Sequence, residues 1–260
     1  MFYLMPATGE WQSTEILHTP DGRSLEALCM VHTFDDEAIT QQVDPLPQSH
    51  PLYELTGTRR HRVQGSHLTG HDFVGNIKQI TPWASRIQGL WPRAGLVTRG
   101  TLFSPEPACR VAVLDFYVGR DVGATSVGVA VPSHNGPPAF SGPSWPGVMA
   151  AAWQGTFRDG DGEIRHIERR YNGLKLDEFV DESRMFSLEL ETWAPDAVAG
   201  GTLTGLARVR GHALHLSGMQ GPALFGEMVD VLAGEWLLGF RMWTRAQRTR
   251  WSEVYRLRPA

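Results

Sequence analysis

The chain has 260 residues, enough for one large domain or two of ordinary size, and its charge is nearly balanced, with 24 Lys and Arg against 28 Asp and Glu. It has no block of like charge, which argues against a nucleic-acid backbone or an anionic membrane surface as a partner. No apolar run approaches the roughly 20 residues that span a bilayer, and the apolar start at residues 1–8 lacks the basic region of a signal peptide. We therefore expect neither nucleic-acid binding nor membrane insertion.

The sequence has only two cysteines, Cys29 and Cys109, and each lies in an apolar run that is typical of a strand. This usage favours buried free thiols over a disulfide and predicts a cytoplasmic location. The 28 glycines and 17 prolines are typical of many short strands joined by turns. Nine tryptophans are enough to fill the core of a small β-barrel or to wall a cavity inside it.

Short runs rich in β-branched and aromatic residues recur along the first half, separated by turn residues such as Pro20-Asp21-Gly22. These predicted strands span residues 26–33, 38–43, 66–74, 96–103, 110–118 and 125–131. Two long irregular stretches, residues 44–53 and 80–93, are predicted to be loops that cover or border a cavity.

Residues 132–147 are too rich in proline and glycine to form a strand or a helix, and they divide the chain nearly in half. A short helix is expected near residues 147–153. Beyond it, strands are predicted at residues 165–171, 185–193, 203–210, 213–216, 228–232, 236–243 and 249–257. So many short strands with so little helix predict an all-β sandwich or barrel.

The two sides of residues 132–147 resemble each other. Trp11 and Trp153 each open a strand that runs to an Asp-Gly turn, and Arg110 and Arg248 each begin a late segment with an acid and a tyrosine at equal spacing. Tryptophan and arginine are separated by 99 residues in the first half and by 95 in the second. This pattern predicts a domain duplication, with halves at residues 1–131 and 148–260 joined by a linker at 132–147.

The Trp-Gln strand that leads to such a turn resembles the first strand of the calycins, the lipocalins and their relatives. With the run Phe103-Ser104-Pro105, the restart at Trp153-Gln154-Gly155 and the late Gly234-Glu235-Trp236, the chain is similar to a family of two-repeat lipocalin-like proteins of unknown function. That family is best known from cyanobacteria and is distantly related to the phycobiliprotein lyases. The resemblance implies two successive lipocalin-like antiparallel β-barrel halves with few short helices, each enclosing a small, largely apolar molecule. It brings no established catalytic residues.

Strand alternation places Trp251, Glu253 and Tyr255 on one face of the last predicted strand, opposite three arginines that we expect to face water. A carboxylate between two aromatic rings inside a barrel is desolvated, which raises its pKa towards the range useful for proton transfer. We therefore predict Glu253 and Tyr255 as catalytic residues and Trp251 as a ligand contact. The alternative is that Glu253 makes a structural hydrogen bond or pairs with an arginine.

Apolar rows of the second half are the expected lining of its barrel and further candidate ligand contacts. They are Phe186, Leu188 and Leu190 on one strand, and Trp236, Leu238, Phe240 and Met242 on another. A filled core explains these rows as well as an open pocket does. In the first half, Asp115 and Tyr117 are the aligned counterparts of Glu253 and Tyr255, but both faces of their strand are apolar, so the inward direction stays open.

Two functions follow from this interpretation. The first is a cofactor-independent cyclase or isomerase that folds a polyketide or terpenoid intermediate in a shaped cavity, with Glu253 and Tyr255 polarising it or moving a proton. The second is a non-catalytic carrier or chaperone of a pigment, lipid or tetrapyrrole. The sequence favours the enzyme, leaves a homodimer open, and also allows filled cavities with a role for the surface. The spacing of its histidines and the lack of glycine-rich phosphate motifs predict no metal and no cofactor.

Overall fold

The computed structural model describes residues 8–25, 27–50, 52–136, 138, 145, 150–159, 162–190, 196–221, 224–245 and 249–260. The chain forms two compact units, Met1–Phe140 and Ser141–Ala260. The division falls within the predicted linker at residues 132–147, most of which lies outside the described residues. No helix in the described part of the chain is long and apolar enough to cross a membrane.

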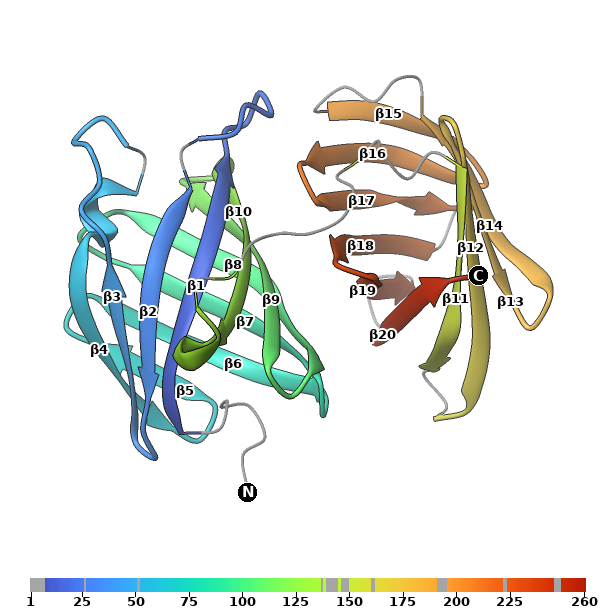
Figure 1. Ribbon diagram of the computed structural model, residues 1–260. Coiled ribbons are helices and arrows are strands. Elements are labelled where there is room, and N and C mark those ends of the chain that lie inside the picture. The colour runs from blue at the N-terminus through green and yellow to red at the C-terminus, as the bar shows by residue number, and fades with distance from the viewer. Residues whose placement is uncertain are drawn as a thin grey trace. The chain divides into compact units, whose positions relative to one another are not determined.

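The first unit is a closed barrel of ten antiparallel strands, in which each strand pairs with its neighbours in the chain and β1 pairs with β10 (Figure 1). Its strands are β1 (Gly9–His18), β2 (Leu28–Phe34), β3 (Ala38–Val43), β4 (Gly57–Gln64), β5 (His67–Gly70), β6 (Phe73–Thr81), β7 (Ala84–Trp91), β8 (Leu96–Glu106), β9 (Cys109–Val118) and β10 (Asp121–Pro132). Two single 3-10 turns, η1 (Tyr53–Leu55) and η2 (Ser133–Asn135), accompany them.

The second unit repeats this order, and β11 pairs with β20 to close it. Its strands are β11 (Ala150–Arg158), β12 (Ile164–Asn172), β13 (Lys175–Val180), β14 (Ser183–Leu190), β15 (Asp196–Gly201), β16 (Leu203–Arg210), β17 (Ala213–Gln220), β18 (Leu224–Ala233), β19 (Trp236–Arg245) and β20 (Thr249–Pro259). The prediction of an all-β chain with two successive barrels is confirmed. Each barrel has more strands than a lipocalin barrel.

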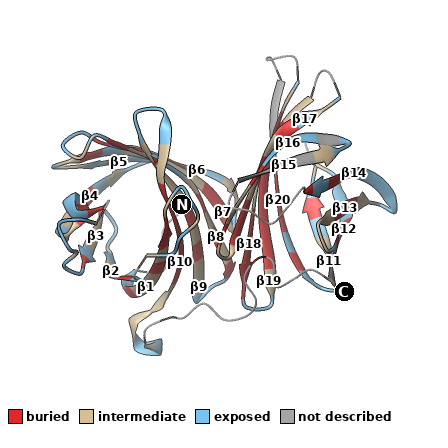
Figure 2. Ribbon diagram, turned by 90° about the horizontal axis from the view of Figure 1, so that it is seen from above, coloured by how far each residue is buried: buried red, intermediate tan, exposed pale blue. Residues whose placement is uncertain are grey.

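Alternation along the strands separates the inside of each barrel from the outside. In β1, Trp11, Ser13, Glu15 and Leu17 are buried, whereas the residues between them are half-buried. Figure 2 shows the buried positions, in red, along the strands of both barrels, and many of the turns are exposed. Because successive side chains of a strand point to opposite faces, each strand contributes every second residue to the interior.

The shared strand order aligns the two halves and corrects the alignment made from the sequence. Trp11 pairs with Pro132 across β1 and β10, and Trp153 pairs with Pro259 across β11 and β20. β10 therefore corresponds to β20. Matching Arg110 to Arg248 is wrong by one strand, because Arg110 lies in β9, whereas Arg248 (outside the described residues) immediately precedes β20.

Two local predictions are also wrong. Residues 80–93 form no long loop, because β6 and β7 extend through them and Pro82 lies in the tight turn that joins the two strands. The helix expected at residues 147–153 is a strand from Ala150 onward, where pairing with β12 outweighs the helix propensity of three alanines. Residues 147–149 lie outside the described residues.

The cysteines are free thiols, but the prediction that they are buried is wrong. Cys29 is exposed and Cys109 is half-buried. Cys29 faces outward because its neighbours Leu28 and Met30 face the interior of the barrel, where both are buried.

Candidate functional site

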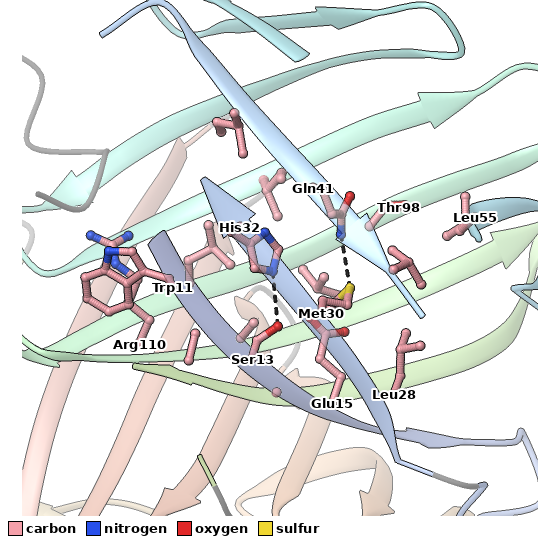
Figure 3. Close-up of a pocket in the computed structure, with 18 of the residues that line it drawn as sticks. Trp11, Ser13, Glu15, Leu28, Met30, His32, Gln41, Leu55, Thr98 and Arg110 are labelled. Atoms are coloured by element: carbon pink, nitrogen blue, oxygen red, sulfur yellow. Dashed lines mark hydrogen bonds between the residues drawn. The ribbon is translucent and has the colours of Figure 1, made fainter. Parts of the chain in front are cut away.

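The interior of the first barrel holds a cavity of about 210 Å³. Inward-facing residues of β1, β2, β3, β9 and β10 form much of its wall, which is mostly apolar. Its polar members are His61 and six residues that Figure 3 labels: Ser13, Glu15, His32, Gln41, Thr98 and Arg110. An enclosed, mostly apolar space with a few placed polar groups is the usual form of a small-molecule site.

One end of this cavity is closed by apolar side chains near the strand ends and by the segment before β4. The buried residues here include Leu28, Leu52, Leu55, Phe73, Trp91 and Phe116. Residues 44–50 and 52 form no strand or helix, as predicted, and Leu52 lines the cavity together with Leu55 of η1. Arg59 holds the segment in place by donating hydrogen bonds to the main-chain oxygens of Glu54 and Leu55.

The other end carries several of the polar groups. Figure 3 shows Trp11 and Arg110 together, with Leu55 at the far side of the pocket. The guanidinium carbon of Arg110 lies 5.2 Å from the centre of the Trp11 ring, a cation–π contact. His32 pairs with Trp11 in the β1–β2 register, and its Nε2 is 3.1 Å from Ser13 Oγ. Because His32 and Arg110 are only half-buried, this end is the more open one.

Glu15 is the acidic residue of the cavity wall. Its side chain is buried and accepts a hydrogen bond from the Ser126 hydroxyl of β10. Burial raises the pKa of this carboxyl above its usual value, and the hydrogen bond from Ser126 offsets only part of that effect. A carboxyl in this state can hold or release a proton beside a bound molecule.

Two wall histidines are held in the neutral form. Burial, with smaller effects from His61 and Arg110, lowers the pKa of His32 to about 4. Burial and the charge of Arg59 likewise lower the pKa of His61 to about 4. At neutral pH, Arg110 is therefore the residue that brings positive charge to the cavity wall.

The interior of the second barrel contains a buried network of charged side chains. Arg169 on β12 donates from Nε to Glu178 Oε2 on β13 at 2.8 Å, and it also donates to Asp230 on β18. Arg241 on β19 donates to Glu178 and to Glu253 on β20. None of the five is more than 7 % exposed. The network therefore ties together strands that are distant in the sequence.

The residues predicted as catalytic belong to this network. Glu253 points into the barrel and accepts hydrogen bonds from Arg241 and, at 3.1 Å, from Trp243 Nε1. Tyr255 also points inward, and its hydroxyl donates to Asp230. Burial raises the pKa of Tyr255 well above its usual value, so the hydroxyl stays protonated as a donor. The pairing of Glu253 with an arginine is the alternative that the sequence left open, and a catalytic role stays a prediction.

The two guanidiniums of the network offset burial to different extents in the pKa values of Glu178 and Asp230. Burial by itself raises the pKa of Glu178, but Arg241 and Arg169 outweigh it and hold that pKa below its usual value. Burial raises the pKa of Asp230, against the opposing effects of Arg169 and the Tyr255 hydrogen bond. Removing one member of such a network leaves a buried charge without compensation, which makes these residues strongly interdependent.

Corresponding positions of the two barrels differ in size. Glu15 pairs with Gly128 in the first barrel, and at the same level Phe157 pairs with Tyr255 in the second. Gly128 leaves space that the Glu15 chain crosses, since a Cβ on Gly128 would lie 2.6 Å from Glu15 Cγ. In the second barrel the Tyr255 ring lies directly over Gly239 and occupies this level. The glycine at this level of the first barrel thus borders a cavity, whereas a tyrosine ring occupies the same level of the second barrel.

Of the two apolar rows predicted to line the second barrel, one faces its interior and the other faces outward. The row on β14, Phe186, Leu188 and Leu190, lies in the core cluster of the second barrel. On β19, Arg241 and Trp243 point inward, so alternation turns the predicted row to the outer face. That row is Trp236, Leu238, Phe240 and Met242, and its placement inside the barrel is wrong. The side chain of Trp251 is not among those described.

Asp115 and Tyr117 point away from the cavity, because their neighbours Leu114 and Phe116 line it. Thr125 donates to Asp115 at 2.6 Å, and the Arg99 guanidinium carbon lies 5.6 Å from the centre of the Tyr117 ring. The corrected alignment of the halves also removes these two residues as counterparts of Glu253 and Tyr255.

The chain has the two-barrel fold of a cyanobacterial protein of unknown function. That protein, from Nostoc punctiforme, is described as a member of the DUF3598 family. It is 10% identical to this chain, with a TM-score of 0.62 over 98% of this chain and 96% of that chain. At this identity the likeness shows the fold alone.

A transferrin binding protein B mutant from Haemophilus parasuis also aligns, at 6% identity over 98% of this chain and 76% of that chain, but its TM-score of 0.23 supports no argument. The sequence matches no family model and no curated protein. Among the described residues, no group of three His, Cys, Asp or Glu side chains could hold a metal ion.

None of the seven polar cavity residues is among the site residues predicted from the sequence, and the seven include Glu15 and Arg110. The signal for Glu15 was present, because alternate positions counted from Trp11 lead to it. The sequence does not predict the direction of Arg110, because the predicted strand that it begins is apolar on both faces. Its inward direction follows from its pairing with Ala130, which also lines the cavity.

The neutral histidines predict a pH-dependent stability of the first barrel. His32 and His61 take up protons near pH 6.5 when unfolded but only near pH 4 when folded. Between these values the unfolded state binds more protons, so the free energy of unfolding falls as the pH drops from 6.5 to 4. Urea unfolding followed by tryptophan fluorescence measures this dependence. The His32→Gln/His61→Gln variant should show a shallower slope in that window, and an unchanged slope would contradict the assignment.

The buried network predicts a large difference between two glutamates of the second barrel. Glu178→Gln should lower the free energy of unfolding by about 3 kcal/mol, because Arg169 and Arg241 lose a buried counter-charge. Glu168→Gln is the matched control, since its pair with the exposed Arg170 should contribute less than about 1 kcal/mol. Denaturant unfolding of both variants checks this, and equal effects would show that the network is not a stabilising element.

Proposed function

We propose that the protein binds a small, largely apolar molecule in the cavity of its first barrel. The observation that carries this proposal is the cavity itself, about 210 Å³ inside a barrel whose far end is closed by apolar side chains. The volume lies below the roughly 300–1,000 Å³ of drug-sized ligand sites, which favours a compact or slender ligand. Of the classes left open by the sequence, a lipid-like molecule fits this volume better than a tetrapyrrole.

A carrier or chaperone is the form of this function that the contacts support best. The groups predicted as catalytic are engaged elsewhere, because Glu253 binds Arg241 and Trp243 while Tyr255 binds Asp230. The lipocalin-like resemblance supports binding, since it implies barrels that enclose small apolar molecules. A cytoplasmic location and a homodimer stay predictions.

The binding function predicts that filling the cavity abolishes uptake of a neutral apolar probe. Ala112 lines the cavity opposite Gly128, so Ala112→Phe places a ring in the space itself. Fluorescence titration with N-phenyl-1-naphthylamine should give one site in the wild type and at least about tenfold weaker binding in Ala112→Phe. Val118→Phe is the control, because Val118 is 59% exposed at the end of the same strand. This variant should bind the probe as tightly as the wild type. Equal binding by all three proteins would place the probe outside the cavity.

A second candidate is a cofactor-independent isomerase or cyclase acting in the first barrel. The observation that favours it is Glu15, a buried carboxyl on the cavity wall whose pKa is raised by burial. Its described hydrogen-bond partner is the neutral Ser126 hydroxyl, whereas Glu253 binds the buried Arg241. Such a group can act as a general acid or base on a molecule held beside it.

The two candidates differ in what happens to a proton of the ligand. Native mass spectrometry of protein from its own host would identify a molecule that co-purifies with it. If Glu15 is an acid–base group, incubation of that molecule in D2O with wild type should introduce deuterium, and Glu15→Gln should slow this about 100-fold with little change in Kd. An unchanged, undeuterated molecule with both proteins identifies a carrier.

A further inference from the structure

Arg110 is a half-buried cation on the cavity wall that makes no ion pair with a carboxylate in the described part of the chain. Its side chain lines the cavity, and its Nε is buried with no hydrogen-bond partner among the described residues. Burial lowers the pKa of Arg110 to about 10, and the nearby Cys109 opposes this in part, so the guanidinium stays charged at neutral pH. Partial removal of a charge from water without an ionic partner is unfavourable, and a bound anion would offset that cost.

The other barrel shows how this chain treats arginines inside a barrel. Arg169 donates to both Glu178 and Asp230, and Arg241 donates to both Glu178 and Glu253. Each of these arginines therefore has two carboxylate partners supplied by the protein. Arg110 differs in facing a cavity instead.

The contacts of Arg110 leave the edge of its guanidinium available to a ligand. The guanidinium of Arg110 lies over the Trp11 ring, with 5.2 Å between its central carbon and the ring centre. A guanidinium that stacks on an aromatic ring still presents N–H groups along its edge, in a planar fork that matches a carboxylate. The Ser13 hydroxyl belongs to the same row, because Ser13 and Arg110 both pair with Ala130.

We propose that the ligand is an amphipathic monocarboxylic acid whose carboxylate binds the guanidinium edge of Arg110. Its apolar chain extends toward Phe73 and Trp91 at the closed end of the barrel. This inference rests on the proposed binding function and names the ligand class of the same cavity. Glu15 lies two positions beyond Ser13 on β1, so it faces the body of the ligand and not the carboxylate.

The single positive charge of the wall also selects among anions. His32, the closest histidine to this end, is neutral at pH 7 because its pKa is lowered to about 4 by burial. One guanidinium balances a carboxylate, whereas a phosphate monoester would carry excess charge into an apolar space.

The test compares two probes that differ only in their head group, decanoate and 1-decanol, by isothermal titration calorimetry at pH 7 on the full chain. Wild type should bind decanoate at least about tenfold more tightly, because the charged hydrogen bonds to Arg110 act on it alone. Arg110→Met should weaken decanoate binding by at least about tenfold and leave 1-decanol within about twofold. Arg99→Met, an exposed arginine on β8 outside the cavity, is the matched control and should change neither.

The outcomes separate this inference from the function on which it rests. Binding of both probes without preference for decanoate, or equal weakening of both by Arg110→Met, overturns the carboxylate assignment while the cavity stays a binding site. Failure of every protein to bind either probe overturns both. Partial recovery of decanoate binding in Arg110→Lys would support the assignment, since lysine restores the charge but not the planar fork.

Discussion

The width of a ten-stranded barrel is the constraint on which the rest of this structure depends. Barrel diameter grows with strand number, and about eight strands already leave an interior that side chains can just fill. A wider barrel must use large side chains or keep a cavity. The second half uses large ones, with the Tyr255 ring over Gly239. The first half has Gly128 paired with Ala112 at the same level, and its interior is hollow.

The same comparison explains where the charges lie. In the aligned registers the neutral pair Ser126 and Leu114 corresponds to Glu253 and Arg241. An ion pair in the second half thus occupies positions that a hydroxyl and an apolar chain occupy in the first. Arg241 of this ion pair also donates a hydrogen bond to Glu178, which makes the pair part of the buried network. Ser126 instead binds Glu15, which keeps a carboxyl on the wall of a cavity.

Most of the strands, the duplication and the inward direction of Glu253 follow from periodicity, which the sequence contains, but β4, β7, β13 and β15 were not predicted. The inner face of β19 does not follow, because its outward residues Leu238 and Phe240 are 0% and 1% exposed. Hydrophobicity cannot choose between two faces that are both buried. The sequence also does not predict the network around Glu253, because its members come from distant strands: Arg241 and Glu178, for example, are 63 residues apart in the sequence. The cavity depends on small residues such as Gly128, whose effect appears only once the strand registers are known.

A fold shared at 10% identity transfers the backbone and not the chemistry, so the site has to be located from its own residues. Buried charges are normally paired, and the second barrel obeys that rule throughout its network. Arg110 and Glu15 share one interior, yet two strand spacings of roughly 5 Å each lie between their strands, and they do not pair in the described structure. Had they been adjacent, they would have formed an internal ion pair as Arg241 and Glu253 do. Their separation leaves a cation at the open end and an acid further in, each directed at whatever occupies the space between them.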